Sequence, residues 1–293
     1  MFVQSNKVSD LKQYFYKKLE HQFSQNEIKL MFQFSLQKRL NLSASDLFLG
    51  RDVLLSESDL LFVRDIANRL LANEPFQYIV GETLFCDLTI KCDKRALIPR
   101  PETEELVFWV QESFRDKKQE YSFIDFCTGS GCIALSLKNS FPNTHILATD
   151  YSYEALVLAK ENSELNKLDI SFLEHDLLTD TFELMSANSI DCIVSNPPYI
   201  PEKDKSEMHE NVLKFEPHLA LFVSNENPLI FYQKIAEIAK KELKKDGFLF
   251  FEIHENLAKE VKAMLLNLDF SDVEIKKDLQ GKDRMIRAKK KMN

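Results

Sequence analysis

The sequence predicts an α/β protein: a doubly wound, mostly parallel sheet with an antiparallel C-terminal hairpin, preceded by a small helical bundle. From Tyr121 onward, strand-like apolar runs alternate with helix-like segments, which is typical of a sheet covered by helices. Residues 1–73 show only helical periodicity. The chain has 293 residues, of which 44% are hydrophobic, and this is enough for two packed domains.

The first region, residues 1–73, is expected to form a bundle of three helices. Its third helix should begin after Ser56, where the sequence has a helix-start pattern. We find no catalytic constellation here, so the region is either a plain structural bundle or a domain that docks a substrate protein. The apolar positions at helical spacing are Leu11, Tyr14, Phe15, Leu19 and Phe23, then Ile28, Met31, Phe32, Leu36 and Leu40, then Leu60, Leu61, Val63, Ile66 and Leu70.

Residues 74–100 are expected to form a hairpin and a stiff linker. Glu74-Pro75 ends the preceding helix, and residues 84–90 alternate partly between apolar and polar, as in a hairpin. Pro101 suits the first turn of a helix, where the acidic residues that follow it are also favourable. We therefore place the start of the third region, residues 101–293, at this proline.

Within the third region the expected strands and helices alternate. The final two strands should form the antiparallel hairpin, and we interpret Lys289-Lys290-Lys291 as a solvated tail. The expected strands are 123–126, 145–148, 170–173, 190–194, 248–253, 271–277 and 284–288, and the expected helices are 132–139, a helix ending at Asn166, 229–243 and 256–266.

Composition argues against several classes of function. The formal net charge of −8 is unfavourable for nonspecific nucleic-acid binding, so we expect no direct nucleic-acid partner. No apolar run approaches the roughly 18 residues of a membrane span, and the start of the sequence lacks the apolar core of a signal peptide. The five cysteines lack CxxC spacing and clustered histidines, so we expect reduced thiols in a cytoplasmic protein and no metal site. We also expect a monomer.

A glycine loop between a strand and a helix is the first candidate binding feature. The chain has only six glycines, where average usage would give about twenty, so each glycine is informative. Gly129 and Gly131 both lie in the stretch Asp125-Phe126-Cys127-Thr128-Gly129-Ser130-Gly131. Such a loop lets a ligand approach the backbone and leaves amide donors at a helix start. It lacks the full G-x-G-x-x-G dinucleotide pattern.

Two acidic residues follow successive strands and extend the candidate site. Asp150, after the second strand, is placed to bind ribose hydroxyls, and Asp176, after the third, could bind an adenine amino group. Either aspartate alone could equally be a helix cap or a turn residue. Because a ribose and an adenine are indicated without a phosphate loop, we predict S-adenosyl-L-methionine as the cofactor and S-adenosyl-L-homocysteine as the product.

The stretch Asn196-Pro197-Pro198-Tyr199 ends the fourth strand and is the candidate catalytic motif. Two prolines cannot continue a central strand, so a rigid corner forms where open α/β sheets bind ligands. The Asn196 oxygen and the Pro197 carbonyl could each accept a hydrogen from an NH2 group, while the Tyr199 ring lies over its plane. The alternative is that Asn-Pro-Pro is only a rigid turn.

These motifs resemble those of the class I S-adenosylmethionine-dependent N-methyltransferases, and most closely the release factor glutamine methyltransferases (the PrmC/HemK family). The resemblance covers nearly the whole chain. Besides the loop, Asp150 and the Asn-Pro-Pro-Tyr motif, it is carried by residues 75–81, Leu97-Ile98-Pro99-Arg100-Pro101-Glu102-Thr103-Glu104, residues 216–221 and residues 281–284.

The resemblance implies a reaction and a role for each motif. The family methylates the side-chain amide nitrogen of the glutamine in the Gly-Gly-Gln motif of class 1 peptide chain release factors. The resemblance implies that Cys127, Thr128, Gly129, Ser130 and Gly131 surround the methionine part of the cofactor, with Asp150 at the ribose and Asp176 and Leu177 at the adenine. Asp125 and Asn196 are further implied cofactor contacts. The glutamine amide is held by Asn196, Pro197, Pro198 and Tyr199. Many relatives have glycine in place of Cys127 and His254, which makes the local loop shape differ.

Because an amide nitrogen is a poor nucleophile and we find no obligatory base, we expect catalysis by positioning the NH2 group against the methyl donor. Three alternatives stay open at this point. The substrate could be a glutamine of a ribosomal protein, or the amino group of a DNA or RNA base. A third possibility is a module that keeps the fold but only binds a partner.

Overall fold

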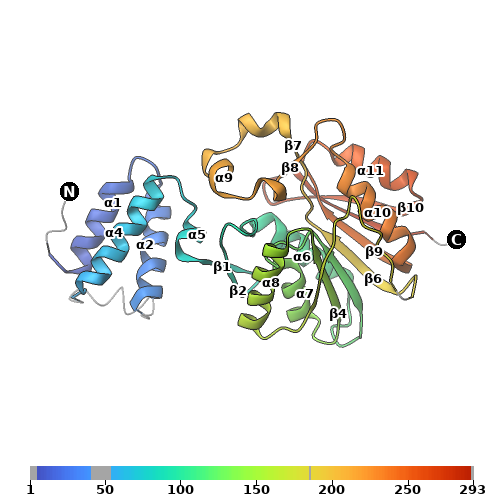
Figure 1. Ribbon diagram of the computed structural model, residues 1–293, viewed down its shortest axis with the longest axis horizontal. Coiled ribbons are helices and arrows are strands. Elements are labelled where there is room, and N and C mark those ends of the chain that lie inside the picture. The colour runs from blue at the N-terminus through green and yellow to red at the C-terminus, as the bar shows by residue number, and fades with distance from the viewer. Residues whose placement is uncertain (1–4, 41–53, 185, 292–293) are drawn as a thin grey trace. The chain divides into compact units, whose positions relative to one another are not determined.

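The computed structural model describes residues 5–40, 54–184 and 186–291. Residues 1–4 and 41–53, which belong to the predicted helical region, lie outside the described residues. The chain divides into two compact units (Figure 1). The first comprises residues 1–81 together with 210–215, and the second comprises residues 82–209 and 216–293. The functional division into 1–73, 74–100 and 101–293 stays a prediction.

The first unit is helical in its described part. Its helices are α1 (Val8–Leu19), α2 (Gln25–Leu40), α4 (Glu57–Leu71) and the short α5 (Phe76–Val80). Helix α4 begins at a capping box, in which the Ser56 side chain accepts a hydrogen bond from the Asp59 backbone amide while the Asp59 side chain accepts one from the Ser56 amide. Helix α5 ends at Gly81, which adopts a φ of 78°.

The apolar faces of α1, α2 and α4 meet in one core. Most positions expected from helical spacing are buried there, including Leu11, Phe15, Leu36 and Ile66. Leu61 is an exception, because its side chain is 51% exposed. It precedes the buried Val63 by two residues, and two residues of an α-helix rotate the chain by about 200°, to the opposite face.

The second unit begins with the predicted hairpin. Strands β1 (Glu82–Phe85) and β2 (Leu88–Lys91) pair antiparallel, with Phe85 opposite Leu88. Helix α6 (Pro101–Ser113) then starts with Pro101 in its first turn, where the missing amide hydrogen is not needed by the helix. The segment between them, residues 92–100, carries no regular structure and contributes to the cavity described below.

A seven-stranded sheet in the order β10-β11-β9-β6-β3-β4-β5 forms the centre of the second unit. The five strands from β9 to β5 are mutually parallel, and β11 runs antiparallel to both of its neighbours. The predicted mostly parallel sheet with an antiparallel C-terminal hairpin is thus confirmed. The strands are β3 (Ser122–Phe126), β4 (His145–Asp150), β5 (Ser171–Glu174), β6 (Ile190–Ser195), β9 (Leu243–Glu252), β10 (Phe270–Lys277) and β11 (Asp283–Lys290).

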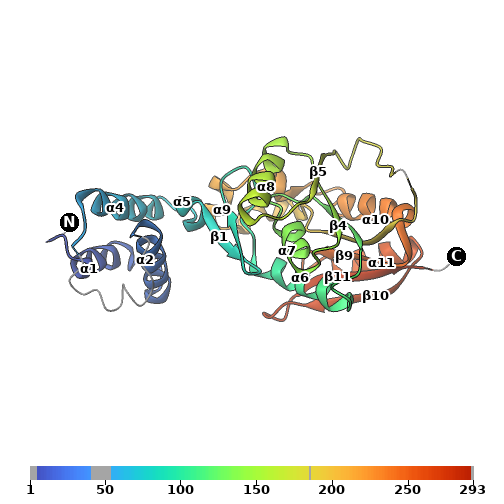
Figure 2. The ribbon, with the colours of Figure 1, turned by 90° about the horizontal axis from the view of Figure 1, so that it is seen from below.

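Helices cover both faces of this sheet (Figures 1 and 2). Helix α6 packs on α7 (Cys132–Ser140), which in turn packs on α8 (Tyr153–Asn166). Helices α10 (Ile230–Glu242) and α11 (Ala258–Asn267) pack together and on the strands toward the C-terminus. Apolar residues of the central strands, such as Ile193 and Phe251, are fully buried against Tyr232 and Ile235 of α10.

The segment between β6 and α10 contains short elements that the sequence does not predict. They are β7 (Ile200–Pro201), the 3-10 helix η1 (Glu202–Glu207), α9 (Glu210–Phe215), the 3-10 helix η2 (His218–Ala220) and β8 (Phe222–Val223), with β7 and β8 paired in parallel. None is long enough to show a reliable hydrophobic period, which is why sequence patterns miss them.

The interpretation of Lys289-Lys290-Lys291 as a solvated tail is wrong for its first two residues. Both belong to β11, which lies between β10 and β9. The Lys290 ammonium donates hydrogen bonds to the Asn188 side-chain oxygen at 2.6 Å and to the Leu243 carbonyl at 2.7 Å. Partial burial lowers its pKa. A basic run at a chain end can therefore complete a sheet.

None of the helices within residues 5–40, 54–184 and 186–291 combines the length and the apolar character that a membrane span requires.

Candidate active site

A cavity of about 280 Å³ lies at the carboxyl ends of β3, β4, β5 and β6. The strand order reverses between β3 and β6, and such a switch point is where open α/β sheets bind ligands. The structure brings most of the predicted site residues to its wall: Cys127, Thr128, Gly129, Ser130, Asp150, Asp176, Leu177, Asn196 and Pro198. Four other predicted residues do not line it: Asp125, Gly131, Pro197 and Tyr199.

The glycine loop connects β3 to α7 in an unusual backbone conformation. Cys127, Gly129 and Gly131 adopt φ values of 58°, 55° and 81°, all in the left-handed region. The Thr128 amide donates to the Thr149 carbonyl at 2.9 Å, which holds the loop against the end of β4. Cys127 is the one non-glycine among the three, so its side chain is carried at a backbone conformation that costs about 1–2 kcal/mol for an L-residue.

Asp125 holds the glycine loop and the start of α7 in place through hydrogen bonds. Its side chain is fully buried, and one carboxylate oxygen accepts hydrogen bonds from the Thr128 hydroxyl at 2.6 Å and the Ala134 amide at 3.2 Å. The other oxygen has no hydrogen-bond partner among the described residues. Burial raises the pKa of Asp125 to about 7. Near neutral pH the acid is thus balanced between its two protonation states.

This pKa predicts how stability depends on pH. A carboxyl whose pKa rises from 3.8 to about 7 on folding stabilises the folded state at low pH, and this contribution is lost as the pH rises through that window. We expect Asp125→Asn, which cannot ionise, to gain melting temperature relative to the wild type between pH 5 and pH 8. Thermal unfolding of both proteins without cofactor measures this, and a difference that stays constant with pH would contradict it.

Gly131 is required for close packing as well as for its backbone conformation. A Cβ atom at this position would lie 3.1 Å from the Ala159 Cβ and 3.4 Å from the Leu135 Cδ1. We expect Gly131→Ala to lower the free energy of unfolding by about 1–3 kcal/mol through overpacking, in addition to the strain of a positive φ. Urea unfolding measures the loss.

Gly281 provides the matched control for this substitution. Its φ is 84°, but a Cβ there would have nothing within 4 Å. Gly281→Ala should therefore show only the conformational cost of about 1–2 kcal/mol. Equal losses at the two positions would mean that contact with Ala159 contributes nothing.

Asp150, the last residue of β4, organises the loop and the start of α8. Its carboxylate accepts hydrogen bonds from the Gly129 amide at 2.8 Å and from the Ser152 amide at 2.9 Å. Burial raises its pKa, and the backbone donors oppose that shift. Because each carboxylate oxygen has two acceptor positions, Asp150 keeps capacity for hydroxyl donors in the cavity.

The residues after β5 form the far end of the cavity. Both Asp176 oxygens accept hydrogen bonds inside their own turn, from the Leu178 amide and the Thr179 hydroxyl, each at 2.9 Å. Leu177 is buried on the wall. His175, which the sequence interpretation does not single out, also lines the cavity, and its Nε2 is buried without a partner among the described residues. Burial lowers the pKa of His175, which favours a neutral imidazole.

The Asn-Pro-Pro-Tyr corner follows β6 directly. The Ser195 hydroxyl donates to the Phe126 carbonyl at 2.6 Å and thereby ties this corner to the end of β3. The Asn196 amide nitrogen donates to the Thr103 hydroxyl at 3.2 Å. The Tyr199 ring contacts the His254 ring edge-on, with centroids 6.0 Å apart, and its hydroxyl donates to Glu252.

An ion pair joins two distant segments at the cavity wall. Arg100 lies 2.5 Å from one Glu216 oxygen, and the other Glu216 oxygen accepts a hydrogen bond from the Ile98 amide at 3.2 Å. The Glu216 side chain is buried. The Pro99-Arg100 connector and the stretch that begins at Glu216 are therefore held together, although they are more than a hundred residues apart in sequence.

Comparison with known proteins is consistent with this arrangement. The PrmC N-terminal domain family matches residues 14–81, and the Methyltransferase small domain family matches residues 110–218. A release factor glutamine methyltransferase of Flavobacterium psychrophilum is 42% identical over 91% of this chain and 93% of its own length. The chain belongs to the release factor glutamine methyltransferase family.

Further relatives agree with this assignment to the release factor glutamine methyltransferases. The protein of that name from Bacteroides thetaiotaomicron is 38% identical over 94% of this chain and 97% of its own length. Among solved structures, a methyltransferase from Pyrococcus furiosus superposes with a TM-score of 0.53 at 19% identity, covering 78% of this chain and 99% of that one. The likeness to the Pyrococcus furiosus protein concerns the fold alone.

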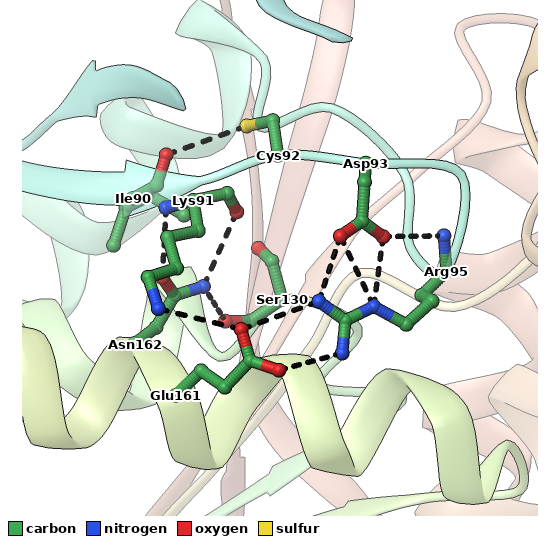
Figure 3. Close-up of polar contacts among 8 residues, drawn as sticks. All are labelled: Ile90, Lys91, Cys92, Asp93, Arg95, Ser130, Glu161 and Asn162. Carbon is green, nitrogen blue, oxygen red and sulfur yellow. Dashed lines mark hydrogen bonds and ion pairs between the residues drawn. The ribbon is translucent and has the colours of Figure 1, made fainter. Parts of the chain in front are cut away.

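In this family member, Asn162 on α8 connects the hairpin to the glycine loop (Figure 3). Its side-chain oxygen accepts from the Lys91 amide at 2.7 Å, and its nitrogen donates to the Lys91 carbonyl at 3.3 Å and the Ser130 carbonyl at 2.9 Å. Asn162 is fully buried. All its hydrogen-bonding groups are thus used to position β2 and the loop.

Arg95 fastens the linker to the same helix. Its guanidinium forms ion pairs with Asp93 at 2.7 Å and with Glu161 at 2.8 Å. Figure 3 shows both contacts. Because Arg95 also lines the cavity, this ion-pair cluster fixes one side of the wall.

Thr103, His175 and Glu252 are among the polar residues of the site that sequence reasoning misses. Glu252 carries a signal that could have found it, because it is an acid at the carboxyl end of an apolar strand, as Asp150 is. Thr103 lies within the resemblance string of residues 97–104, but nothing local indicates that its hydroxyl reaches Asn196. For His175 the sequence gives no signal.

Proposed function

We propose that this protein transfers a methyl group from S-adenosyl-L-methionine to the side-chain amide nitrogen of the glutamine in the Gly-Gly-Gln motif of class 1 peptide chain release factors. The observation that supports it most is the position of Asn196 and Pro198, which share one cavity wall with the glycine loop and Asp150. An amide-binding corner and a nucleoside-binding loop thus lie together in a member of the release factor glutamine methyltransferase family.

The residues of the cavity fit the cofactor by their chemistry. Asp150 offers carboxylate acceptors for ribose hydroxyls, and the left-handed loop from Cys127 to Gly131 brings backbone close to the cavity. Asp176 and Leu177 would border the adenine, beside His175 Nε2, for which the described part of the chain provides no hydrogen-bond partner. The carboxylate of Asp150 on the cavity wall favours a ligand with positive charge. When bound, the cofactor supplies an electrophilic methyl group on a sulfonium.

The residues of the Asn-Pro-Pro-Tyr corner orient the substrate amide. Pro197 and Tyr199 do not line the cavity themselves, but they are the chain neighbours of Asn196 and Pro198, which do. In this proposal Asn196 Oδ1 and the Pro197 carbonyl accept the two NH2 hydrogens, and the Tyr199 ring packs against the amide plane. Fixing both hydrogens directs the nitrogen lone pair and stabilises the positive charge that develops on nitrogen. No side chain is required as a strong base, because the proton can leave to water afterwards.

We further propose that residues 1–73, the helical region of the first unit, dock the release factor at a surface away from its Gly-Gly-Gln loop. A glutamine side chain offers few contacts, so discrimination among proteins must come from a second surface. The family match over residues 14–81 covers most of this unit and supports a role shared across the family.

Methyl transfer from radiolabelled S-adenosyl-L-methionine tests the proposed function directly. Purified class 1 release factors, a release factor with Gln→Ala in the Gly-Gly-Gln motif, ribosomal proteins and nucleic acids are compared as acceptors. We expect label only on the release factors that keep the native glutamine, and peptide mapping should place it on the glutamine of the Gly-Gly-Gln motif. Preferential labelling of a ribosomal protein or of a nucleic acid would replace the proposed substrate.

A further inference from the structure

Glu252, the last residue of β9, connects two segments of the proposed active site. Its side chain is almost fully buried, with 2% of its surface exposed. One carboxylate oxygen accepts a hydrogen bond from the Tyr199 hydroxyl at 2.9 Å, and the other accepts one from the Thr103 hydroxyl at 2.6 Å. A single carboxylate therefore restrains a residue of the Asn-Pro-Pro-Tyr corner and a residue of α6.

The bond to Thr103 determines how the Asn196 amide is turned. A threonine hydroxyl has one proton, and Thr103 donates it to Glu252, so its oxygen can only accept from Asn196. Asn196 must then present its NH2 group to Thr103, at 3.2 Å. Its oxygen is left as the atom available to a substrate. The orientation of this amide thus follows from hydrogen-bond donors and acceptors along a chain of three residues.

We propose that Glu252 is a positioning residue for methyl transfer, acting through Thr103 on the Asn196 amide and directly on Tyr199. The inference rests on the proposed function, because it assigns to Asn196 Oδ1 the task of accepting a hydrogen from the substrate amide. It deepens that function by naming what holds the acceptor in place.

The hydrogen-bond geometry gives both Glu252 carboxylate oxygens an accepting role. Burial raises the pKa of Glu252, and the negative charge of Glu102 adds to this shift, whereas the hydrogen bonds from Thr103 and Tyr199 and the positive charge of Arg284 oppose it. The Tyr232 hydroxyl also donates a hydrogen bond to the Glu252 backbone carbonyl at 3.2 Å, which holds the end of β9 in place. The titratable groups that face the carboxylate are Glu102 on α6, Tyr199 after β6, Tyr232 on α10 and Arg284 on β11.

Glu252→Gln is the decisive variant, since it keeps the volume of the side chain. A glutamine amide has one accepting oxygen, so it cannot accept from Thr103 and Tyr199 through separate oxygens. If its NH2 faces Thr103, the Thr103 proton turns toward Asn196 and the Asn196 amide reverses. We expect kcat for release-factor methylation to fall about 10- to 100-fold, the cost of a misplaced reacting group. Cofactor Kd should stay within about twofold, because Glu252 does not line the cavity.

Two variants at Thr103 test the relay separately. Thr103→Val removes the hydroxyl at nearly constant volume and should lower kcat, whereas Thr103→Ser should restore most of what valine loses. In the Glu252→Gln background, Thr103→Val should lower kcat further by much less than it does alone, because both changes break one chain of hydrogen bonds. The comparison of Thr103→Val with Thr103→Ser in the otherwise wild-type protein keeps the test valid if Glu252→Gln does not fold.

Glu242→Gln is the matched control. Glu242 is also a buried glutamate, and it precedes the other end of the same strand, outside the cavity. Its variant should methylate release factors at the wild-type rate. An unchanged kcat for both Glu252→Gln and Thr103→Val would overturn the inference, as would equal losses of kcat and cofactor affinity. A wild-type protein that fails to methylate any release factor would instead reject the proposed function, so the two failures are distinguishable.

Discussion

Asn196→Ala should lower the rate of methyl transfer to release factors by about 10²–10³-fold, the usual loss when one aligned electrostatic group is removed from an active site. In the proposed mechanism Asn196 Oδ1 accepts a hydrogen from the substrate NH2, and alanine removes this acceptor. Cofactor affinity should fall only modestly, since Asn196 is one of many residues on the cavity wall. Single-turnover methylation and calorimetric titration measure the two effects.

Asn143→Ala is a suitable control for this change. Asn143 is exposed before β4, away from the cavity, and its amide donates to the Lys118 carbonyl at 2.8 Å. This variant should retain the wild-type rate. If Asn196→Ala also retains near-normal turnover, catalysis by positioning the substrate amide is wrong.

Asp150→Ala should weaken S-adenosyl-L-methionine binding by about 10- to 150-fold, which corresponds to roughly 1.5–3 kcal/mol for hydrogen bonds to a charged acceptor. The variant loses the proposed acceptor for ribose hydroxyls, and it also releases the Gly129 and Ser152 amides, which donate hydrogen bonds to the carboxylate. Calorimetric titration gives the affinity.

Asp150→Asn separates these two contributions. It keeps one oxygen acceptor but loses the charge and half of the acceptor capacity. We expect it to retain more loop stability than alanine does, as judged by thermal unfolding without cofactor, and still to bind the cofactor more weakly than the wild type. Unchanged cofactor affinity in both variants would remove Asp150 from the site.

The sequence predicts the sheet well because each strand leaves a local pattern. Apolar runs identify β3, β6 and the second half of β9, and two prolines end β6 within one residue of the predicted end. The first half of β9, residues 243–247, is missed because it is mostly polar. Lys289 and Lys290 are misread because charge suggests solvent, while strand pairing with β9 and β10 decides their environment. The short elements between Ile200 and Val223 depend on packing that no local period records.

The candidate site also contains residues that the sequence predicts and residues that it does not. Residues next to strand ends, such as Asp150 and Asn196, are predictable because parallel strands bring their carboxyl ends to one edge. The link between Thr103 and Glu252 is not, because it joins side chains 149 positions apart that become neighbours only in the folded protein. The sequence also does not show whether a predicted residue lines the cavity or, like Asp125, is buried behind the glycine loop, because this depends on the tertiary structure.

The three hydrogen bonds of Asn162 limit how this position can drift during evolution. Aspartate has no donor for the Lys91 and Ser130 carbonyls, and glutamine is one methylene too long for a fully buried site. Leucine or alanine would remove the hydrogen-bond partner of three backbone groups beside the glycine loop, namely the Lys91 amide, the Lys91 carbonyl and the Ser130 carbonyl. A position that looks like an ordinary helical residue therefore has essentially one acceptable occupant. In a saturation library of this chain, we expect residue 162 to be as intolerant of change as the motif residues themselves.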